Sequence, residues 1–448
     1  MLLTTLIGIL ILYMRVPLDG SAVSAAGTLT GVGAMAVLNA AAGWIGARAS
    51  ARLSARAGGA SMGPVRIFRA LQLGVVCFLV LDVYLFDWPG FVGDLFSGVP
   101  WLPLADELVL LAPLLVMLAT QVVFHYCYEL ARGHCSLGLR RYMALRFRVE
   151  PAVVLVPLLM LAAMSDVVDM IYAQSPARDL AGAVAGGAFV VLLAVFGPLV
   201  LRALWHTSPL PPGPVRERLE ALSRKLKFRC TDILMWHTYG FVPNAGIVGF
   251  LPFVRYVVIT DAALAHLTAD EIEAVFAHEM GHARKHHFLF YLLFAAAFVA
   301  FAANLLDLAA AAGVVGSAGD LLRGELTTGQ AALMCLFAGL YWWAVFGWLS
   351  RRHEEQADGF VLGACERPEA LVTALQRLAL LSGTPERASS WRHFSIRRRV
   401  DFLTRALHEP DLVGRVDRKV RAIQWAMAAL LVLSVVRLVV WRPELLGL

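Results

Sequence analysis

The sequence has few charged residues and no recognisable cysteine pattern. Only 16% of its 448 residues are charged and 59% are hydrophobic, which is too apolar for a soluble globular protein. Its six cysteines include no C-x-x-C pair and show no regular spacing, so we expect neither a disulfide framework nor a cysteine metal site. The net charge of +6 needs no nucleic-acid partner, because basic loops on an anionic membrane leaflet account for it.

Long apolar runs of membrane-spanning length occupy much of the chain. We therefore predict a mainly α, polytopic membrane protein with about eight or nine transmembrane helices and the lipid bilayer as its surroundings. The first run is short for a full crossing, and no basic residue precedes it, which argues against a signal peptide. The candidate spans are 2–14, 24–47, 67–87, 105–127, 150–173, 180–204, 287–312, 329–349 and 422–441.

Lys and Arg are absent between Arg69 and Arg132, a stretch that carries six acidic residues. Arginines crowd the links on either side, at Arg48–Arg69 and Arg132–Arg148. The positive-inside rule places both basic links in the cytoplasm, and counting onward places 205–286 and 350–421 there as well. This predicts a protein of the cell inner or plasma membrane.

The segment 267–287 has the features of a helix. Thr268 followed by Glu271 is a capping box, and basic residues follow acidic ones along the segment, as the helix dipole favours. The segment contains His278-Glu279-Met280-Gly281-His282, an H-E-x-x-H motif. On a helix, His278 and His282 project from the same side and can both bind one divalent ion.

The motif predicts a catalytic zinc site with one ion per chain. Two imidazoles and a carboxylate suit zinc, and an open fourth position makes such a site catalytic. Glu279 would lie beside the metal without binding it, where it can take a proton from the attacking water.

The region around the motif predicts a small α+β segment at the cytoplasmic face. Four prolines and a glycine at 209–214 mark a boundary, a helix is expected at 215–227, and strands at 232–238, 246–250 and 256–260. We expect five parts: transmembrane 1–205, catalytic 206–286, a transmembrane hairpin 287–349, cytoplasmic helical 350–421, and a last span 422–448.

The third ligand is expected where the chain returns to the cytoplasm. Glu354 and Asp358 are four residues apart and share one helical face, so one can bind the ion and the other can hydrogen-bond a ligating imidazole. From spacing alone, His353 or Glu355 could serve in place of Glu354.

Other polar residues lie in or beside apolar runs. Asp82 and His125 fall within or near predicted spans, where ionisable residues are functional candidates, although each is close enough to a helix end to be a polar end group. The motif helix either continues into the apolar run or bends near His286 and His287. The simplest interpretation of both residues is that they are polar groups at the membrane interface, and we favour it strongly for His286.

Together these motifs resemble the integral-membrane zinc peptidases that include the CAAX prenyl proteases and the HtpX-type heat-shock proteases. H-E-x-x-H is followed by S-R-x-x-E-x-x-A-D at 350–358. Further similar segments, in chain order, are Pro243–Ala245, Val257–Asp261, Gly281-His282 with His287, and His393–Arg399, where Phe394 replaces the family's usual proline.

The resemblance implies roles for individual residues. Glu354 is implied as the third zinc ligand, and Asp358 as a conformational partner of the site. Arg399 and His393 are implied as polar groups near the reacting carbonyl, and Asn244 as part of a strand with which the substrate pairs.

These observations predict a membrane-integral zinc endopeptidase acting on peptides or membrane proteins. The alternative is a membrane transporter or scaffold with a structural zinc site, which would need a fourth protein ligand. A peptidase held inactive until a partner or stress opens it is equally compatible with the sequence.

Overall fold

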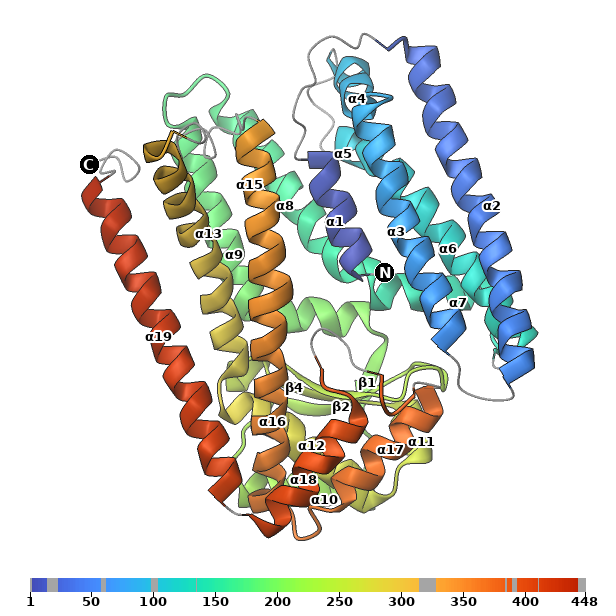
Figure 1. The fold of residues 1–448 in the computed structure, drawn as a ribbon, viewed down its shortest axis with the longest axis vertical. Coiled ribbons are helices and arrows are strands. Elements are labelled where there is room, and N and C mark those ends of the chain that lie inside the picture. Colours follow the sequence, from blue (N-terminus) through green and yellow to red (C-terminus); the bar gives the residue numbers. More distant parts are fainter. Residues whose placement is uncertain are drawn as a thin grey trace. The chain divides into compact units, whose positions relative to one another are not determined.

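The computed structural model describes residues 2–13, 23–57, 62–97, 104–133, 135–313, 328–382, 385–388, 393–409 and 411–441. The chain forms two compact units, Met1–Thr207 and Ser208–Leu448 (Figure 1). Part of the predicted hairpin link, 314–327, and the end of the predicted last segment, 442–448, lie outside the described residues.

The first unit is helical throughout its described residues. Its core contains Leu79, Leu111, Leu114 and Met117, all fully buried. Proline stands in the first turn of α6 and α8, where its missing N–H costs no helix hydrogen bond. The helices are α1 (Leu2–Tyr13), α2 (Ala25–Ala57), α3 (Met62–Tyr84), α4 (Trp88–Phe96), α5 (Ala105–Leu110), α6 (Ala112–Ala131), α7 (Leu139–Val149), α8 (Pro151–Tyr172) and α9 (Arg178–Leu204).

Seven helices in the described part of the chain are long and apolar enough to cross a membrane. They coincide with seven of the predicted spans: Ala25–Arg56, Gly63–Tyr84, Ala112–Ala131, Pro151–Tyr172, Leu180–Leu204, His287–Ala311 and Asp411–Arg437. The other two predicted spans differ for separate reasons. The first is the short helix α1, and 329–349 is divided by a π-helical stretch, Gly339–Phe346.

The two ionisable residues noted in the predicted spans differ in their surroundings. Asp82 is fully buried in α3, and neither carboxylate oxygen has a hydrogen-bond partner among the described residues. His125 in α6 lies with Nδ1 2.6 Å from the Tyr142 hydroxyl of α7. His125 therefore has a structural role in joining two helices.

The second unit contains a four-stranded mixed sheet, β1 (Thr207–Pro209), β2 (Asp232–Trp236), β3 (Ala245–Val248) and β4 (Tyr256–Thr260). The strand order is β1-β2-β4-β3, with β2 parallel and β3 antiparallel to β4. All five residues of β4 are buried, as expected for a central strand. The three strands expected from the sequence are present, whereas β1, in the proline-rich boundary, was not predicted.

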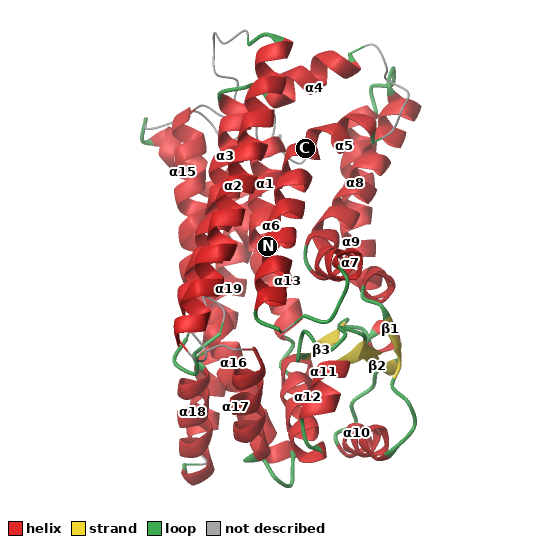
Figure 2. Ribbon diagram, turned by 90° about the vertical axis from the view of Figure 1, so that its right-hand side faces the viewer, coloured by secondary structure: helices red, strands yellow, loops and turns green. Residues whose placement is uncertain are grey.

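Helices complete this unit, and Figure 2 shows α10 and α12 close to the strands. Residues 347–364 form a single helix, α16, whose polar stretch from His353 to Asp358 is buried. The helices are α10 (Pro214–Lys225), α11 (Asp261–His266), α12 (Ala269–Arg284), α13 (His287–Ala311), α15 (Thr328–Ala338), α16 (Gly347–Ala364), α17 (Ala370–Ser382), α18 (Ile396–His408) and α19 (Asp411–Trp441), with a short 3-10 helix at Pro252–Val254.

The motif helix does not run straight into the membrane. α12 ends at Arg284, and His286 adopts a left-handed backbone conformation with φ of 55° before α13 begins at His287. Such a conformation is uncommon for a residue with a side chain and turns the chain sharply. The bend near His286-His287 that the sequence allowed is therefore present, and it gives His287 a different direction from the rest of α12.

Candidate metal centre

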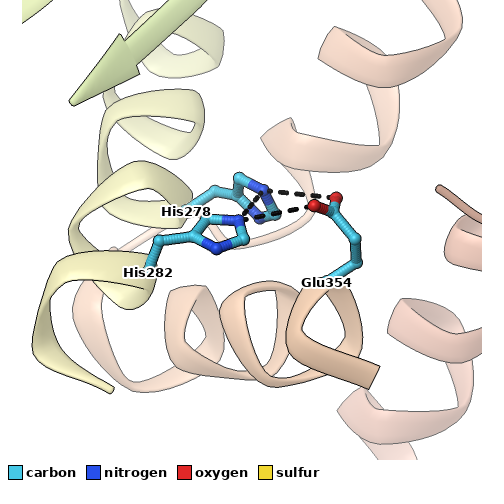
Figure 3. Close-up of side chains that lie close together, drawn as sticks. All are labelled: His278, His282 and Glu354. Carbon is cyan, nitrogen blue, oxygen red and sulfur yellow. Dashed lines mark hydrogen bonds and ion pairs between the residues drawn. The ribbon is translucent and has the colours of Figure 1, made fainter. Parts of the chain in front are cut away.

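Helix α12 presents both motif histidines to one point. Its predicted capping box is confirmed, because the Thr268 hydroxyl accepts from the Glu271 N–H at 3.3 Å and the Thr268 N–H donates to Glu271 Oε2 at 2.8 Å. Buried Ile272, Phe276 and Met280 pack the helix into the core. His278 and His282, one turn apart, then face α16 (Figure 3).

Helix α16 approaches α12 closely because Gly281 has no side chain. A Cβ at Gly281 would lie 3.0 Å from Ala357 Cα and 3.1 Å from Phe360 Cβ. This contact brings Glu354, on the facing helix, opposite the two histidines. The three residues come from segments that α13 and α15 separate in sequence.

The donor atoms of His278, His282 and Glu354 lie within 4.8 Å of one another. The two Nε2 atoms are 3.2 Å apart, and the Glu354 oxygens lie 3.8 Å from His278 Nε2 and 3.6 Å from His282 Nε2. Zinc bonds of about 2.0–2.2 Å place the donors of a tetrahedron about 3.3–3.6 Å apart. The donor set therefore fits one zinc ion, in spacing and in chemistry.

The other predicted polar residues surround this group. Asp358 Oδ1 lies 2.9 Å from His278 Nδ1, so it can accept the proton that leaves His278 Nε2 free for a metal. Arg399 donates to both oxygens of Asp358, at 2.6 and 3.0 Å, and lies 3.4 Å from Glu354. His393 Nδ1 is 3.1 Å from Glu354 Oε1, and its half-exposed ring faces the cavity beside the group.

The electrostatics of Glu354 and His282 favour metal binding, whereas burial lowers the pKa of His278 but its hydrogen bond with Asp358 raises it overall. Burial raises the pKa of Glu354, but the hydrogen bond from His393 and the charge of Arg399 outweigh it and hold that pKa well below its usual range. Burial lowers the pKa of His282 to about 3, which keeps its imidazole neutral. An ionised carboxylate and a neutral imidazole are the forms that bind zinc.

Glu279 lies beside the donor group in a different environment. Burial raises the pKa of Glu279 to about 7, while a hydrogen bond from the Ile247 backbone N–H of β3 favours its ionised form. A carboxylate with a pKa near neutrality is suited to accept and return a proton. The same hydrogen bond joins the candidate base to strand β3.

A cavity of about 510 Å³ opens onto these residues. His278, Glu279, His282, Glu354, His393 and Arg399 line its polar part. Asn244 lines it from the end of β3, where its backbone N–H donates to the Thr260 hydroxyl at 2.9 Å. Asn244 immediately precedes β3. Among the described strands, β3 pairs only with β4, so it is an edge strand of the sheet.

The residues that were open alternatives for the third ligand have other contacts. His353 is fully buried and stacks on His287, with ring centroids 4.0 Å apart. Glu355 pairs with Arg352 and Arg398 instead of the histidines. The carboxylate that joins His278 and His282 is that of Glu354.

Sequence reasoning missed two features of the site. The first is the contact that His287 makes: it is buried with Nδ1 2.8 Å from His282 Nδ1, so the interfacial interpretation is wrong for this residue. The second is the apolar wall of the cavity, formed by Leu371, Leu375 and Leu378 of α17. Their spacing of four and three residues marks one face of a helix and could have identified this wall.

Gly281→Ala is expected to lower both the unfolding temperature and the zinc affinity. The added methyl group would press on the α16 backbone, and overpacking of this kind costs about 1–3 kcal/mol. Thermal unfolding and metal titration in detergent measure both effects. Gly363→Ala is the matched control, since a Cβ there meets nothing within 4 Å. Wild-type behaviour of Gly281→Ala would show that the two helices need not approach so closely.

The chain is similar to known proteases and to one peptidase family. Residues 209–418 match the sequence profile of Peptidase family M48. A protease HtpX homolog of Aeropyrum pernix is 28% identical over 197 residues, 43% of this chain and 60% of that protein. A protease HtpX homolog of Campylobacter hominis is 33% identical over 140 residues, 31% of this chain and 47% of that protein.

Two further matches concern the CAAX protease branch and the fold. A CAAX prenyl protease 1 homolog of Arabidopsis thaliana is 31% identical over 100 residues, 22% of this chain and 24% of that protein. The crystal structure of S. mikatae Ste24p has a similar fold, with a TM-score of 0.50 and 17% identity, covering 86% of this chain and all of that one. The chain spans less than two thirds of the length of each curated relative. The match to Peptidase family M48 covers residues 209–418, the part of the chain that contains His278, His282 and Glu354.

Proposed function

We propose that this protein is a membrane-integral zinc endopeptidase that hydrolyses peptide bonds. The observation that carries the proposal is the position of Glu279, on the cavity wall beside the donor group of His278, His282 and Glu354. A carboxylate next to a three-donor zinc site is the arrangement that H-E-x-x-H metallopeptidases require.

Zinc bound by His278, His282 and Glu354 would supply Lewis-acid polarisation of water and of the scissile carbonyl. Glu279 takes the proton from the attacking water and later passes it to the leaving amine. Its pKa of about 7 matches both tasks, since the group must accept and then donate near neutral pH.

Two cationic or polar side chains are placed to stabilise negative charge on the carbonyl oxygen. Arg399 is held by Asp358 in a two-point contact, which fixes the guanidinium at the cavity wall. His393 reaches the same part of the cavity and is more exposed. We assign both as groups near the reacting carbonyl, a role that favours the transition state over the bound substrate.

The substrate lies extended along the outer edge of β3, next to Asn244. Edge strands offer unpaired backbone groups to a peptide in the same conformation. Ile247 of β3 contacts Glu279, so a peptide paired there passes close to the base. Leu371, Leu375 and Leu378 would then contact an apolar side chain of the substrate.

The biological substrates we infer are membrane proteins or membrane-tethered peptides, in quality control or processing. The support is the position of the metal site, on helices that directly adjoin the apolar helix α13.

A transporter or scaffold with a structural zinc site is the rival function. In the part of the chain that the structure describes, the donor group contains three residues, and a cavity reaches it. Closed structural sites have four protein ligands. A proteolysis assay in detergent comparing wild type with Glu279→Gln decides between the two functions.

We propose that the catalytic unit faces the cytoplasm of the inner or plasma membrane, on the basis of the arginine-rich stretches Arg48–Arg69, where α2 ends and α3 begins, and Arg132–Arg148, after α6. In a cysteine-free background, cysteines at Glu217 and Arg387 should then be protected from an impermeant thiol reagent in intact cells. A cysteine at Ser97 should be labelled, and all three positions are exposed on the protein. Permeabilised cells, in which all three should react, provide the control. Labelling of Glu217→Cys from outside would reverse the orientation.

A further inference from the structure

A continuous line of hydrogen bonds runs from His282 away from the donor group. His282 Nδ1 lies 2.8 Å from His287 Nδ1, and His287 Nε2 lies 3.0 Å from Gln356 Oε1. Gln356 Nε2 donates to Asp417 Oδ1 at 2.9 Å. The line therefore joins α12 to the start of α13, to α16 and to the last helix, α19.

The far end of this line determines the direction of every bond in it. Asp417 accepts hydrogen bonds only, and its second oxygen is held by Lys285. The amide nitrogen of Gln356 must therefore point to Asp417, which leaves its oxygen to accept from His287 Nε2–H. A neutral imidazole that donates through Nε2 has an unprotonated Nδ1.

The same logic then fixes the ring of His282. Its Nδ1 faces the unprotonated Nδ1 of His287, so His282 must donate through Nδ1–H. The proton on Nδ1 leaves a lone pair on His282 Nε2, the atom that faces His278 Nε2 and Glu354. This is the tautomer that binds a metal through Nε2.

Packing holds the line in place. His287 and Gln356 are almost completely buried, so neither can exchange its partner for water. His353 stacks face to face on His287, with an interplanar angle of 7°, and Gln424 of α19 lies 3.3 Å from His353 Nε2. Two residues of α19, Asp417 and Gln424, therefore support the two stacked rings.

We propose that His287, Gln356 and Asp417 are positioning residues that set the tautomer and orientation of His282 for metal binding. His278 has its orienting carboxylate, Asp358, in direct contact, whereas His282 obtains the same effect through two intermediates. The last membrane helix thereby contributes to zinc affinity although it supplies no ligand. The inference rests on the zinc site of the proposed function, but it does not depend on peptidase activity.

The test measures zinc affinity in purified full-length variants by competition with a chromophoric chelator. His287→Phe keeps a flat ring against His353 but removes the acceptor, and should weaken zinc binding about ten- to a hundredfold, as loss of an orienting partner does. His287→Asn places an amide oxygen near the position of Nδ1, where it can again accept from His282 Nδ1–H. The zinc affinity of this variant should therefore be within roughly a few-fold of wild type. A residue with only a packing role would not show this rescue.

Two more variants examine the rest of the line. Gln356→Met removes the acceptor for His287 Nε2–H, so the His287 proton can move to Nδ1. There it would face the proton on His282 Nδ1 and disfavour the tautomer of His282 that binds zinc, and the zinc affinity should fall about tenfold. Asp417→Asn lets the Gln356 amide take either orientation and should cause a smaller loss of zinc affinity.

His286→Asn is the matched control, because His286 is exposed and asparagine tolerates its left-handed backbone. The zinc affinity of His286→Asn should equal that of wild type.

Thermal unfolding of the zinc-free proteins separates loss of folding from loss of orientation. Wild-type zinc affinity in His287→Phe would overturn the proposal, as would an equal loss in His287→Asn and His287→Phe. If His287→Phe does not fold, the zinc affinity of Gln356→Met is the deciding measurement. A wild-type zinc affinity in Gln356→Met would overturn the proposal. A wild-type protein that binds zinc but cleaves no peptide refutes the peptidase function alone, and one that binds no zinc refutes both.

Discussion

Glu279→Gln is expected to lower peptide turnover about a hundredfold or more while the protein keeps its zinc. Glutamine has nearly the same shape but cannot accept a proton, so only the chemical step is lost. The Glu279 carboxylate is not one of the three donors, so this variant still has His278, His282 and Glu354 to hold the ion.

The measurements are zinc content by elemental analysis and turnover of a peptide substrate in detergent. Glu366→Gln, an exposed glutamate in the same unit, makes the same chemical change away from the cavity and should retain full turnover. Full activity in Glu279→Gln would remove the proposed mechanism. Loss of zinc from Glu279→Gln would instead place this residue among the ligands.

Glu354→Ala is expected to abolish zinc retention during purification, whereas Glu355→Ala should retain the ion. The neighbouring carboxylates point to different partners: Glu354 to His278 and His282, and Glu355 to Arg352 and Arg398. Removing Glu354 leaves two imidazoles as donors, which is too few for a protein zinc site.

Asp358→Asn gives an intermediate result in the same measurement. It retains an oxygen that can accept from His278 Nδ1–H but loses the charge that holds Arg399, so zinc affinity should fall about ten- to a hundredfold. If Glu355→Ala loses its zinc and Glu354→Ala keeps it, Glu355 and not Glu354 is the third ligand. Equal retention in all three variants would exclude this site as the zinc centre.

The sequence predicted those parts of the site that depend on local pattern. The capping box at Thr268 and Glu271 and the four-residue spacing of His278 and His282 are properties of one helix, and the structure has both. The choice of Glu354 over His353 and Glu355 needed the family resemblance, because all three lie on consecutive positions of α16. Their separate directions follow from how α16 packs on α12, which spacing does not encode.

His287 shows why the remainder could not be predicted. It follows His282 by five residues, which on a straight helix places it about 140° away around the axis. The left-handed residue His286 breaks the helix and turns the His287 ring back to His282. Histidine is several-fold enriched among the few non-glycine residues with a positive φ, but most histidines have a negative φ, so the identity of His286 alone does not predict this turn.

The span at 329–349 illustrates a similar limit. Hydropathy indicates an apolar segment of sufficient length, and the described residues there are helical. The π-helical stretch from Gly339 to Phe346 depends instead on aromatic packing, such as Tyr341 against Phe294 with ring centroids 4.1 Å apart. Long-range contacts of this kind are invisible to a count of apolar residues.

The separation of the ligands in sequence has a consequence for biosynthesis. His278 and His282 leave the ribosome before α13, and Glu354 leaves it only after α15. The ion can be held by all three donors only after both intervening segments have been synthesised and α16 has docked on α12. A nascent or misinserted chain therefore has a half-formed centre, so the proposed protease would become active only once its own assembly in the bilayer is complete.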